Sequence, residues 1–213
     1  MNTVANLLVA LAMGLNLFAL GRGRLAAIIG LVATQGVVLG LLPLVLEPRL
    51  TGLVALMAGV TLAVKGVLIP WLLRRAMRTA KVDTELQPLL GFAASVCLGV
   101  VGMIGALIGS RWLPLLPEHA GTLLVPGALA TIFTGFILLV GRTKAIAQVC
   151  GYLVLENGIY LFGLLLLRST PLLVESGILL DLTVGVFVIG IMIDRILRAF
   201  DSLDTRKLTA LRE

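Results

Sequence analysis

Long apolar blocks alternate with short polar or basic breaks along the whole chain. A helix needs about 20 apolar residues to cross the hydrocarbon of a bilayer. Blocks of that size can be placed at 3–20, 25–46, 51–73, 88–109, 122–140, 145–167 and 172–198. Several prolines fall at or near block ends, where a helix can stop without freeing a backbone carbonyl in lipid. The pattern predicts an all-α integral membrane protein of about seven transmembrane helices.

The composition supports a bilayer as the main solvent. Of the 213 residues, 59% are hydrophobic and 13% are charged, and the mean hydropathy is +1.11. No block of soluble composition is long enough to fold alone, so we expect residues 1–213 to form a single membrane domain. The first block has neither a basic region ahead of it nor a small-residue cleavage site, so we interpret it as a span rather than a signal peptide.

The basic residues are distributed unevenly between the two sides of this layout. Arg49, Arg111 and Arg168 lie on one side. The other side has thirteen: Arg22, Arg24, Arg74, Arg75, Arg78, Lys81, Arg142, Lys144, Arg195, Arg198, Arg206, Lys207 and Arg212. Because basic loops stay in the cytoplasm, we expect the N-terminus outside and the C-terminus cytoplasmic, with 199–213 as an amphipathic cytoplasmic tail. The net charge of +6 therefore indicates topology, not a nucleic-acid partner.

Ligands for metals and redox cofactors are missing from the sequence. Cys97 and Cys150 lie alone inside apolar blocks, and His119 is the single histidine. Zinc, haem and iron–sulfur sites need more ligands than these. The chain also lacks a histidine cluster, a nucleophile–base pair and extended catalytic loops. We therefore expect no cofactor, no metal and no catalytic residue.

Three charged residues lie deepest within the predicted spans, namely Lys65, Glu156 and Asp181. A charge at bilayer depth costs at least ~2.5–3.5 kcal/mol, so each needs a partner, a proton or water. Glu156 is twelve positions from Lys144, which places it roughly 18 Å from that end of its helix. We expect the three groups to form a lateral polar layer. Lys65 is expected to face the bundle or a neighbouring subunit, with an acceptor in Glu156, Asp181 or a carboxylate on that subunit.

The helix of Glu156 also carries a polar stripe. Gln148, Tyr152, Glu156 and Tyr160 follow one another at four-residue steps, which places them on one slowly drifting face. One interpretation is proton transfer through Glu156, Asp181, Lys65, Tyr152 and Gln148, because movement of a nearby ammonium shifts the proton affinity of a buried carboxyl. The other is a fixed ion pair or hydrogen-bonded acid that only holds the helices together.

A weak internal repeat is also present. The stretch 21–43 resembles 141–164 when shifted by about 121 positions, which aligns Gln35 with Glu156. Residues 1–80 would then duplicate 122–198 in the same orientation. Gly36 and Gly40, like Gly105 and Gly109, have the four-residue spacing of close-packing helices.

The segment Gly151-Tyr-Leu-Val-Leu-Glu156-Asn157-Gly-Ile159 resembles the E-type membrane subunits of hydrogenase-4 and formate hydrogenlyase complexes. The last three helices, 122–198, also resemble the NuoK subunit of complex I and the C-type subunit of multi-subunit sodium/proton antiporters. In that family a glutamate lies in the middle helix and an acid followed by glycine in the third. Glu156 matches the first, and Asp181 with Gly185 matches the second, although Asp replaces Glu.

The resemblance implies a non-catalytic subunit of a complex I-related oxidoreductase in a bacterial or archaeal inner membrane. Its partners would be antiporter-like membrane subunits and the subunits that carry the NiFe centre and iron–sulfur clusters. Two other functions remain open. The buried charges and possible repeat also suit an independent secondary transporter or antiporter component. A membrane-embedded enzyme is the third alternative.

Overall fold

The chain is described here by a computed structural model that covers residues 2–46, 52–79, 88–113 and 121–165. The predicted seventh span at 172–198, Asp181 and the tail at 199–213 lie outside the described residues. The described elements are α1 (Asn2–Leu20), α2 (Leu25–Gly40), α3 (Leu42–Leu46), α4 (Gly52–Ala63), the π-helical η1 (Val64–Leu68), α5 (Ile69–Thr79), α6 (Phe92–Gly109), the 3₁₀ turn η2 (Ser110–Trp112), α7 (Leu124–Gly141) and α8 (Ala145–Leu165).

Six helical stretches among the described residues are long and apolar enough to cross a membrane. They are Thr3–Leu20, Leu25–Leu46, Val54–Arg78, Phe92–Trp112, Leu124–Gly141 and Ala145–Leu165. The first six predicted spans are therefore confirmed as helices, with two shifts of boundary. The fourth begins at Phe92 rather than at 88 because Pro88 instead forms a β-bridge with Arg142. The third runs on to Thr79, since arginines favour helices and can extend their charged ends to the interface.

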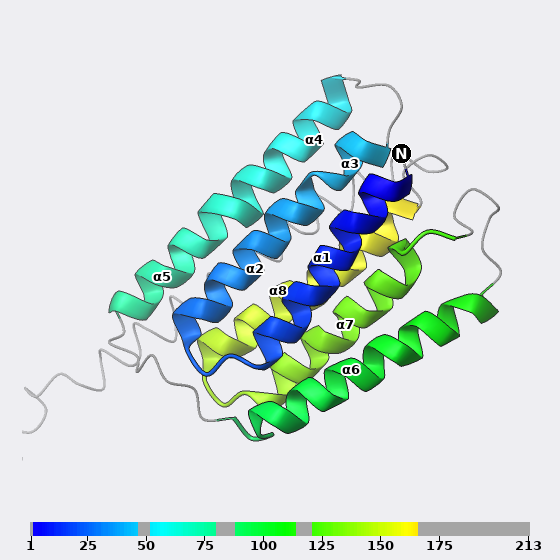
Figure 1. Ribbon diagram of the computed structural model, residues 1–213. Coiled ribbons are helices and arrows are strands. Elements are labelled where there is room, and N and C mark those ends of the chain that lie inside the picture. The colour runs from blue at the N-terminus through cyan, green and yellow to red at the C-terminus, as the bar shows by residue number, and fades with distance from the viewer. Residues whose placement is uncertain (1, 47–51, 80–87, 114–120, 166–213) are drawn as a thin grey trace, which may run out of the picture.

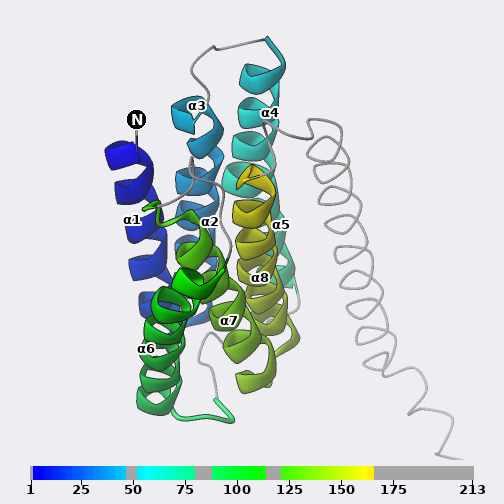
Figure 2. The same cartoon turned by 90° about the vertical axis from the view of Figure 1, so that its right-hand side faces the viewer.

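The helices form an elongated bundle (Figure 1). Helices α1, α2, α7 and α8 contact one another, while α6 lies along α7 and α1 at one edge. The continuous helix from α4 through η1 to α5 lies against α2 at the opposite edge. Figure 2 shows the same bundle after a quarter turn.

Glycines set how closely the helices approach. A Cβ on Gly151 would lie 2.5 Å from the backbone nitrogen of Leu139, and one on Gly158 would lie 2.7 Å from that of Ile132. Helices α7 and α8 therefore pack backbone against backbone. Gly36 and Gly40 face the α4–η1 segment, where a Cβ would lie 2.9 Å from the Lys65 Cβ and 3.1 Å from a Leu62 methyl carbon, so their predicted packing role is confirmed.

The predicted packing role of Gly105 and Gly109 is not supported within the described residues. A Cβ at either position would meet nothing there within 4 Å. Both lie on α6, the most peripheral helix, of which 17% is buried. Residue spacing alone does not show which neighbour a helix will have.

Two apolar clusters fill the interior, one toward each end of the bundle. One gathers Leu20, Ile28, Ile137 and Val154 with their neighbours, and the other gathers Val9, Leu39, Ala128 and Leu161 with theirs. Buried polar side chains lie on the helical turns between the two clusters: Asn16, Gln35, Thr61, Lys65, Thr131, Thr134, Glu156 and Asn157. The bundle thus has a polar layer across its middle.

The described basic residues are distributed unevenly between the two ends of the bundle, as predicted. Seven cationic residues lie at the end where α1 meets α2 and α7 meets α8: Arg22, Arg24, Arg74, Arg75, Arg78, Arg142 and Lys144. Of the described residues, only Arg111 is cationic at the other end. We call the first end the basic end.

Candidate functional site

The polar layer contains a buried ion pair between two helices far apart in sequence. The Lys65 Nζ atom on η1 lies 3.4 Å from the Glu156 Oε1 atom on α8. Lys65 is 8% exposed and Glu156 5%. Of the acceptors expected for Lys65, the structure therefore brings Glu156 within reach, inside this chain.

Lys65 belongs to a π-helical turn whose origin can be traced to Pro70. The turn spans Val64–Leu68, and the Ile69 N–H bonds to the carbonyl of Val64, five residues back. In a regular α-helix, the ring of Pro70 would clash with the carbonyl of Gly66. A wider turn relieves that clash, and such π turns frequently occur at functional sites. The sequence shows Pro70 within the third apolar block, which is a usable signal of an irregular helix.

Three further groups surround the Lys65 side chain. Its Nζ atom donates a hydrogen bond of 3.1 Å to Asn157 Oδ1 and lies 5.1 Å from the centroid of the Tyr160 ring. Gly36 on α2 allows close approach, since a Cβ there would lie 2.9 Å from the Cβ of Lys65. The carboxylate of Glu156, the amide oxygen of Asn157 and the ring face of Tyr160 all interact favourably with a cation. The surroundings of Lys65 are therefore suited to a charged ammonium group.

A chain of side-chain amides continues from Asn157 across the bundle. Asn157 Nδ2 donates to Gln35 Oε1 at 3.2 Å. Gln35 Nε2 donates to Asn16 Oδ1 at 2.6 Å, and Asn16 Nδ2 donates to Thr131 Oγ1 at 2.9 Å. The chain links α8, α2, α1 and α7 within the membrane interior.

All four hydrogen bonds from Lys65 to Thr131 are donated in the same direction. Each carbonyl oxygen faces back toward Lys65, so the amide dipoles add and stabilise its positive charge. Hydrogen bonds in such a chain polarise one another. Amide groups do not titrate in the physiological range, so this chain of hydrogen bonds can orient Lys65 but adds no titratable group of its own.

A small cavity lies beside the pair. It has a volume of about 10 Å³ and is lined by Lys65 and Asn157 together with apolar residues that include Ile69, Pro70 and Leu73. This is close to the least volume that can hold one water molecule, ~10–15 Å³. The cavity lies on the side of Lys65 that leads along α5 toward the basic end.

The other residues of the polar stripe predicted on α8 do not all lie next to the Lys65–Glu156 ion pair. Gln148 lies near the basic end, where its Nε2 donates a 3.0 Å hydrogen bond to the Arg142 carbonyl. Tyr152 is half-buried on α8, one turn before Glu156. Tyr160 contacts Lys65 through its ring. The stripe thus extends from the basic end to the pair, but the structure does not place Gln148 in contact with Glu156.

Asn157, Gln35, Asn16 and Thr131 were not identified as site residues from the sequence. Each is a polar residue inside an otherwise apolar span, and polar groups in such spans normally face the protein interior. That rule could have identified them as buried. It could not have shown that they contact one another.

Arg142 was counted from the sequence among the basic residues that indicate topology, and the structure gives it a packing role as well. The residue follows α7 at the basic end but is only 1% exposed. Its Nη2 atom donates a 2.6 Å hydrogen bond to the Leu20 carbonyl, and the guanidinium lies 4.8 Å from the centroid of the Phe92 ring. Burial lowers the pKa of Arg142 from its usual value. The residue joins the ends of α1, α6 and α7.

No group of three or more His, Cys, Asp or Glu residues able to hold a metal ion occurs in the described parts of the chain.

Comparison with known proteins gives relatives of similar length. The uncharacterized protein Rv0085 of Mycobacterium tuberculosis is 33% identical over 196 residues, covering 90% of this chain and 88% of that protein. Hydrogenase-4 component E of Escherichia coli K12 is 29% identical over 150 residues, covering 70% of this chain and 68% of that protein. The same component of Shigella flexneri gives equal values. No family model matches the chain, and no solved structure matches it.

The distant similarity to hydrogenase-4 component E supports the resemblance found in the sequence. The resemblance of the last three helices to NuoK and to the antiporter C-type subunit stays a prediction.

Proposed function

Since this chain belongs to the same family as the uncharacterized protein Rv0085 of Mycobacterium tuberculosis, and resembles hydrogenase-4 component E, we propose that it is a non-catalytic membrane subunit of a hydrogenase complex. The six membrane-length helices make it a multi-pass subunit. Its partners are NiFe and iron–sulfur subunits, which hold the redox centres, and antiporter-like membrane subunits. Its contribution is proton translocation or its coupling to the redox reaction.

The observation that carries this proposal is the Lys65–Glu156 pair in the membrane interior. Burying two charges costs several kcal/mol each, and an apolar pair of similar volume would often hold helices together equally well. An ionisable pair at this depth is therefore better explained by a function than by stability alone. The π-helical turn at Lys65 supports the same interpretation.

The proton-exchange step follows from the chemistry of the two groups. While Lys65 carries its proton, the ammonium favours the ionised form of Glu156. When the ammonium moves away or loses its proton, the buried carboxylate is no longer compensated and takes up a proton. Small movements of the η1 turn would therefore change the proton affinity of Glu156. Asn157 and the amides behind it return Lys65 to the charged, paired position.

Asp181 extends this proposed route beyond Glu156, on the predicted seventh helix. Tyr152 and Gln148 extend it in the opposite direction, toward the basic end. Because the basic residues gather at that end, we place the end in the cytoplasm of a bacterial or archaeal cell. The N-terminus is then outside and the C-terminus cytoplasmic. Glu156 would exchange protons with the cytoplasmic side through the Tyr152–Gln148 face of α8.

The test is Glu156→Gln in the native complex, isolated through a tag on this chain. Gln keeps the shape and the hydrogen bonding but cannot titrate. We expect the complex to assemble and to oxidise or evolve hydrogen with an artificial dye, while proton movement in membrane vesicles falls by at least about tenfold. Arg24→Gln, which removes an exposed charge at the basic end, is the control and should leave proton movement intact.

The set of proteins that co-purify with the chain distinguishes a hydrogenase subunit from an independent transporter. Co-purification of hydrogenase and antiporter-like subunits supports the proposal. Recovery of the chain as a lone oligomer would contradict it and favour the secondary transporter. Unchanged proton movement in the assembled Glu156→Gln complex would reduce the ion pair to a structural contact.

A further inference from the structure

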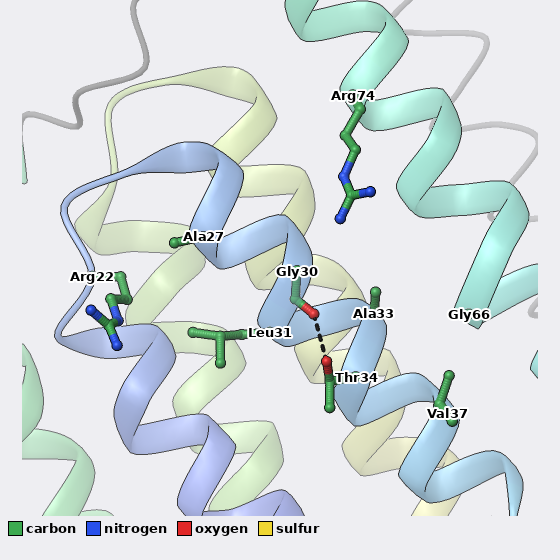
Figure 3. Close-up of a pocket in the computed structure, with 9 residues that line it drawn as sticks. All are labelled: Arg22, Ala27, Gly30, Leu31, Ala33, Thr34, Val37, Gly66 and Arg74. Carbon is green, nitrogen blue, oxygen red and sulfur yellow. Dashed lines mark hydrogen bonds between the residues drawn. The ribbon is translucent and has the colours of Figure 1, made fainter.

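A surface hollow at the basic end has neither Lys65 nor Glu156 in its lining. It lies between α2 and the η1–α5 segment, has a volume of about 490 Å³, and has Arg22 and Arg74 in its lining. Figure 3 shows Arg74 extending from α5 toward α2, with Arg22 beside the start of α2. The lining also includes the small residues Ala27, Gly30, Ala33 and Gly66. Two cations thus flank a trough of small apolar residues.

A second hollow of about 620 Å³ adjoins the first and shares Ala33, Gly66 and Arg74 with it. Its lining also includes Trp71, Arg75 and Arg78, and the Arg75 guanidinium lies 5.4 Å from the centroid of the Trp71 ring. Neither hollow has an acidic side chain among the described residues that line it. We call the two together the arginine trough.

The trough exists because α2 carries small residues where it faces α5. A Cβ on Gly30 would meet nothing within 4 Å. The Thr34 hydroxyl donates to the Gly30 carbonyl at 2.9 Å, so one of the few polar groups of the trough already has a partner (Figure 3). Apart from Trp71, the other side chains among the described residues of the lining are apolar, so a small hydrophilic anion would meet cations here but few further side-chain donors.

We propose that the arginine trough binds an anionic glycerophospholipid. The arginines, led by Arg22 and Arg74, hold the phosphodiester of the headgroup, because guanidinium groups pair with phosphate oxygens through charge-assisted hydrogen bonds. An acyl chain lies along Ala33 and Gly66. Both hollows fall within the ~300–1,000 Å³ typical of ligand sites. Basic pockets between membrane helices at the cytoplasmic side suit such headgroups.

The bound lipid would also contact the helix that carries the ion pair. Gly66 lies in the lining of both hollows and directly follows Lys65 in the η1 turn. The lipid therefore supports the π-helical turn from the membrane side, while Asn157 and Glu156 contact the Lys65 side chain from the interior.

The test measures lipid binding to the full-length chain, purified with whatever subunits remain bound and washed free of lipid in detergent. Native mass spectrometry would titrate dioleoylphosphatidylglycerol, dioleoylphosphatidylcholine and inorganic phosphate. We expect phosphatidylglycerol to bind at least tenfold more tightly than phosphatidylcholine, and phosphate alone not to bind. Equal binding of both lipids, or binding of phosphate at the same arginines, would overturn the proposal.

Variants locate the bound lipid. Arg22→Gln/Arg74→Gln should weaken phosphatidylglycerol binding roughly 30-fold, since each cation near an anionic lipid contributes about a fivefold factor in affinity. Gly30→Leu should weaken it by filling the trough without altering charge. Arg24→Gln, at the same end but outside both linings, and Arg111→Gln, at the opposite end, are charge-matched controls. Equal loss in the controls would show a general charge effect and refute a site at the trough.

Discussion

Gly36 on α2 and Lys65 on η1 pack so closely that a Cβ on the glycine would lie 2.9 Å from the Cβ of the lysine. This contact holds the backbone of η1 against α2, next to the Gln35 amide that bonds Asn157. The position of the buried cation thus depends on the absence of one methyl group on the neighbouring helix.

Gly36→Val is therefore expected to push η1 away from α2. Overpacking of this kind typically costs ~1–3 kcal/mol, and proton movement should fall because Lys65 is displaced from Glu156. Gly30→Ala on the same helix is the control, because its Cβ has free space and alanine favours a helix by ~0.5–1 kcal/mol over glycine. Thermal unfolding in detergent would measure both. A Gly36→Val protein as stable as the unmodified chain would contradict the close contact.

The Lys65–Glu156 pair predicts a non-additive pattern of stability. Lys65→Met removes the cation facing a buried carboxylate, and removing one partner of a buried pair typically costs ~3–5 kcal/mol. Lys65→Met/Glu156→Gln removes both charges and should recover most of that stability. Proton movement should remain absent in the double variant. If the two substitutions destabilise the protein additively, the two groups do not interact. If Lys65→Met retains proton movement, Lys65 is a buried cation that the fold tolerates and that has no role in proton transfer.

Pro70→Ala is expected to remove the cause of the π-helical turn. With an N–H available and no ring clash, the segment can return to regular α-helical bonding. Because a π turn holds one residue more than an α turn, regular bonding would rotate the preceding helix by about 100° relative to α5 and carry Lys65 away from Glu156. The regained backbone hydrogen bond offsets part of the cost of separating the ion pair, so stability should fall less than in Lys65→Met, while proton movement falls.

Pro126→Ala serves as the control for this change, because Pro126 lies in the first turn of α7, where proline is well tolerated. A structure of the Pro70→Ala protein in which Lys65 still contacts Glu156 would refute the account of the turn.

Arg142 is expected to contribute to stability through hydrogen bonding and packing rather than topology alone. Arg142→Met leaves the Leu20 carbonyl without its 2.6 Å donor, which should cost ~1–3 kcal/mol. Arg142→Ala also loses packing against Phe92 and should be less stable than Met. Exposed Arg24→Gln should change stability by less than ~0.5 kcal/mol. Denaturation in mixed micelles would rank the three, and an Arg142→Ala protein as stable as Arg24→Gln would contradict this role.

The positions of the six described spans follow from the sequence because bilayer thickness sets a helix length that hydropathy can detect. Burial of Lys65 and Glu156 follows as well, since a charge within an apolar span must avoid lipid. The choice of Glu156 as partner, and the chain from Asn157 to Thr131, depend on how each helix is rotated about its axis. That rotation comes from contacts such as Gly36 with Lys65, which join residues far apart in sequence.

Arg142 also separates what the sequence shows from what helix packing determines. Its sequence context, a basic residue at the end of an apolar block, correctly placed it at the basic end. Its burial required Leu20 and Phe92, from two other helices, to meet above it. Hydropathy reports the depth of a residue along the membrane normal, whereas the neighbours at that depth are set by helix packing, which no single segment of the chain encodes.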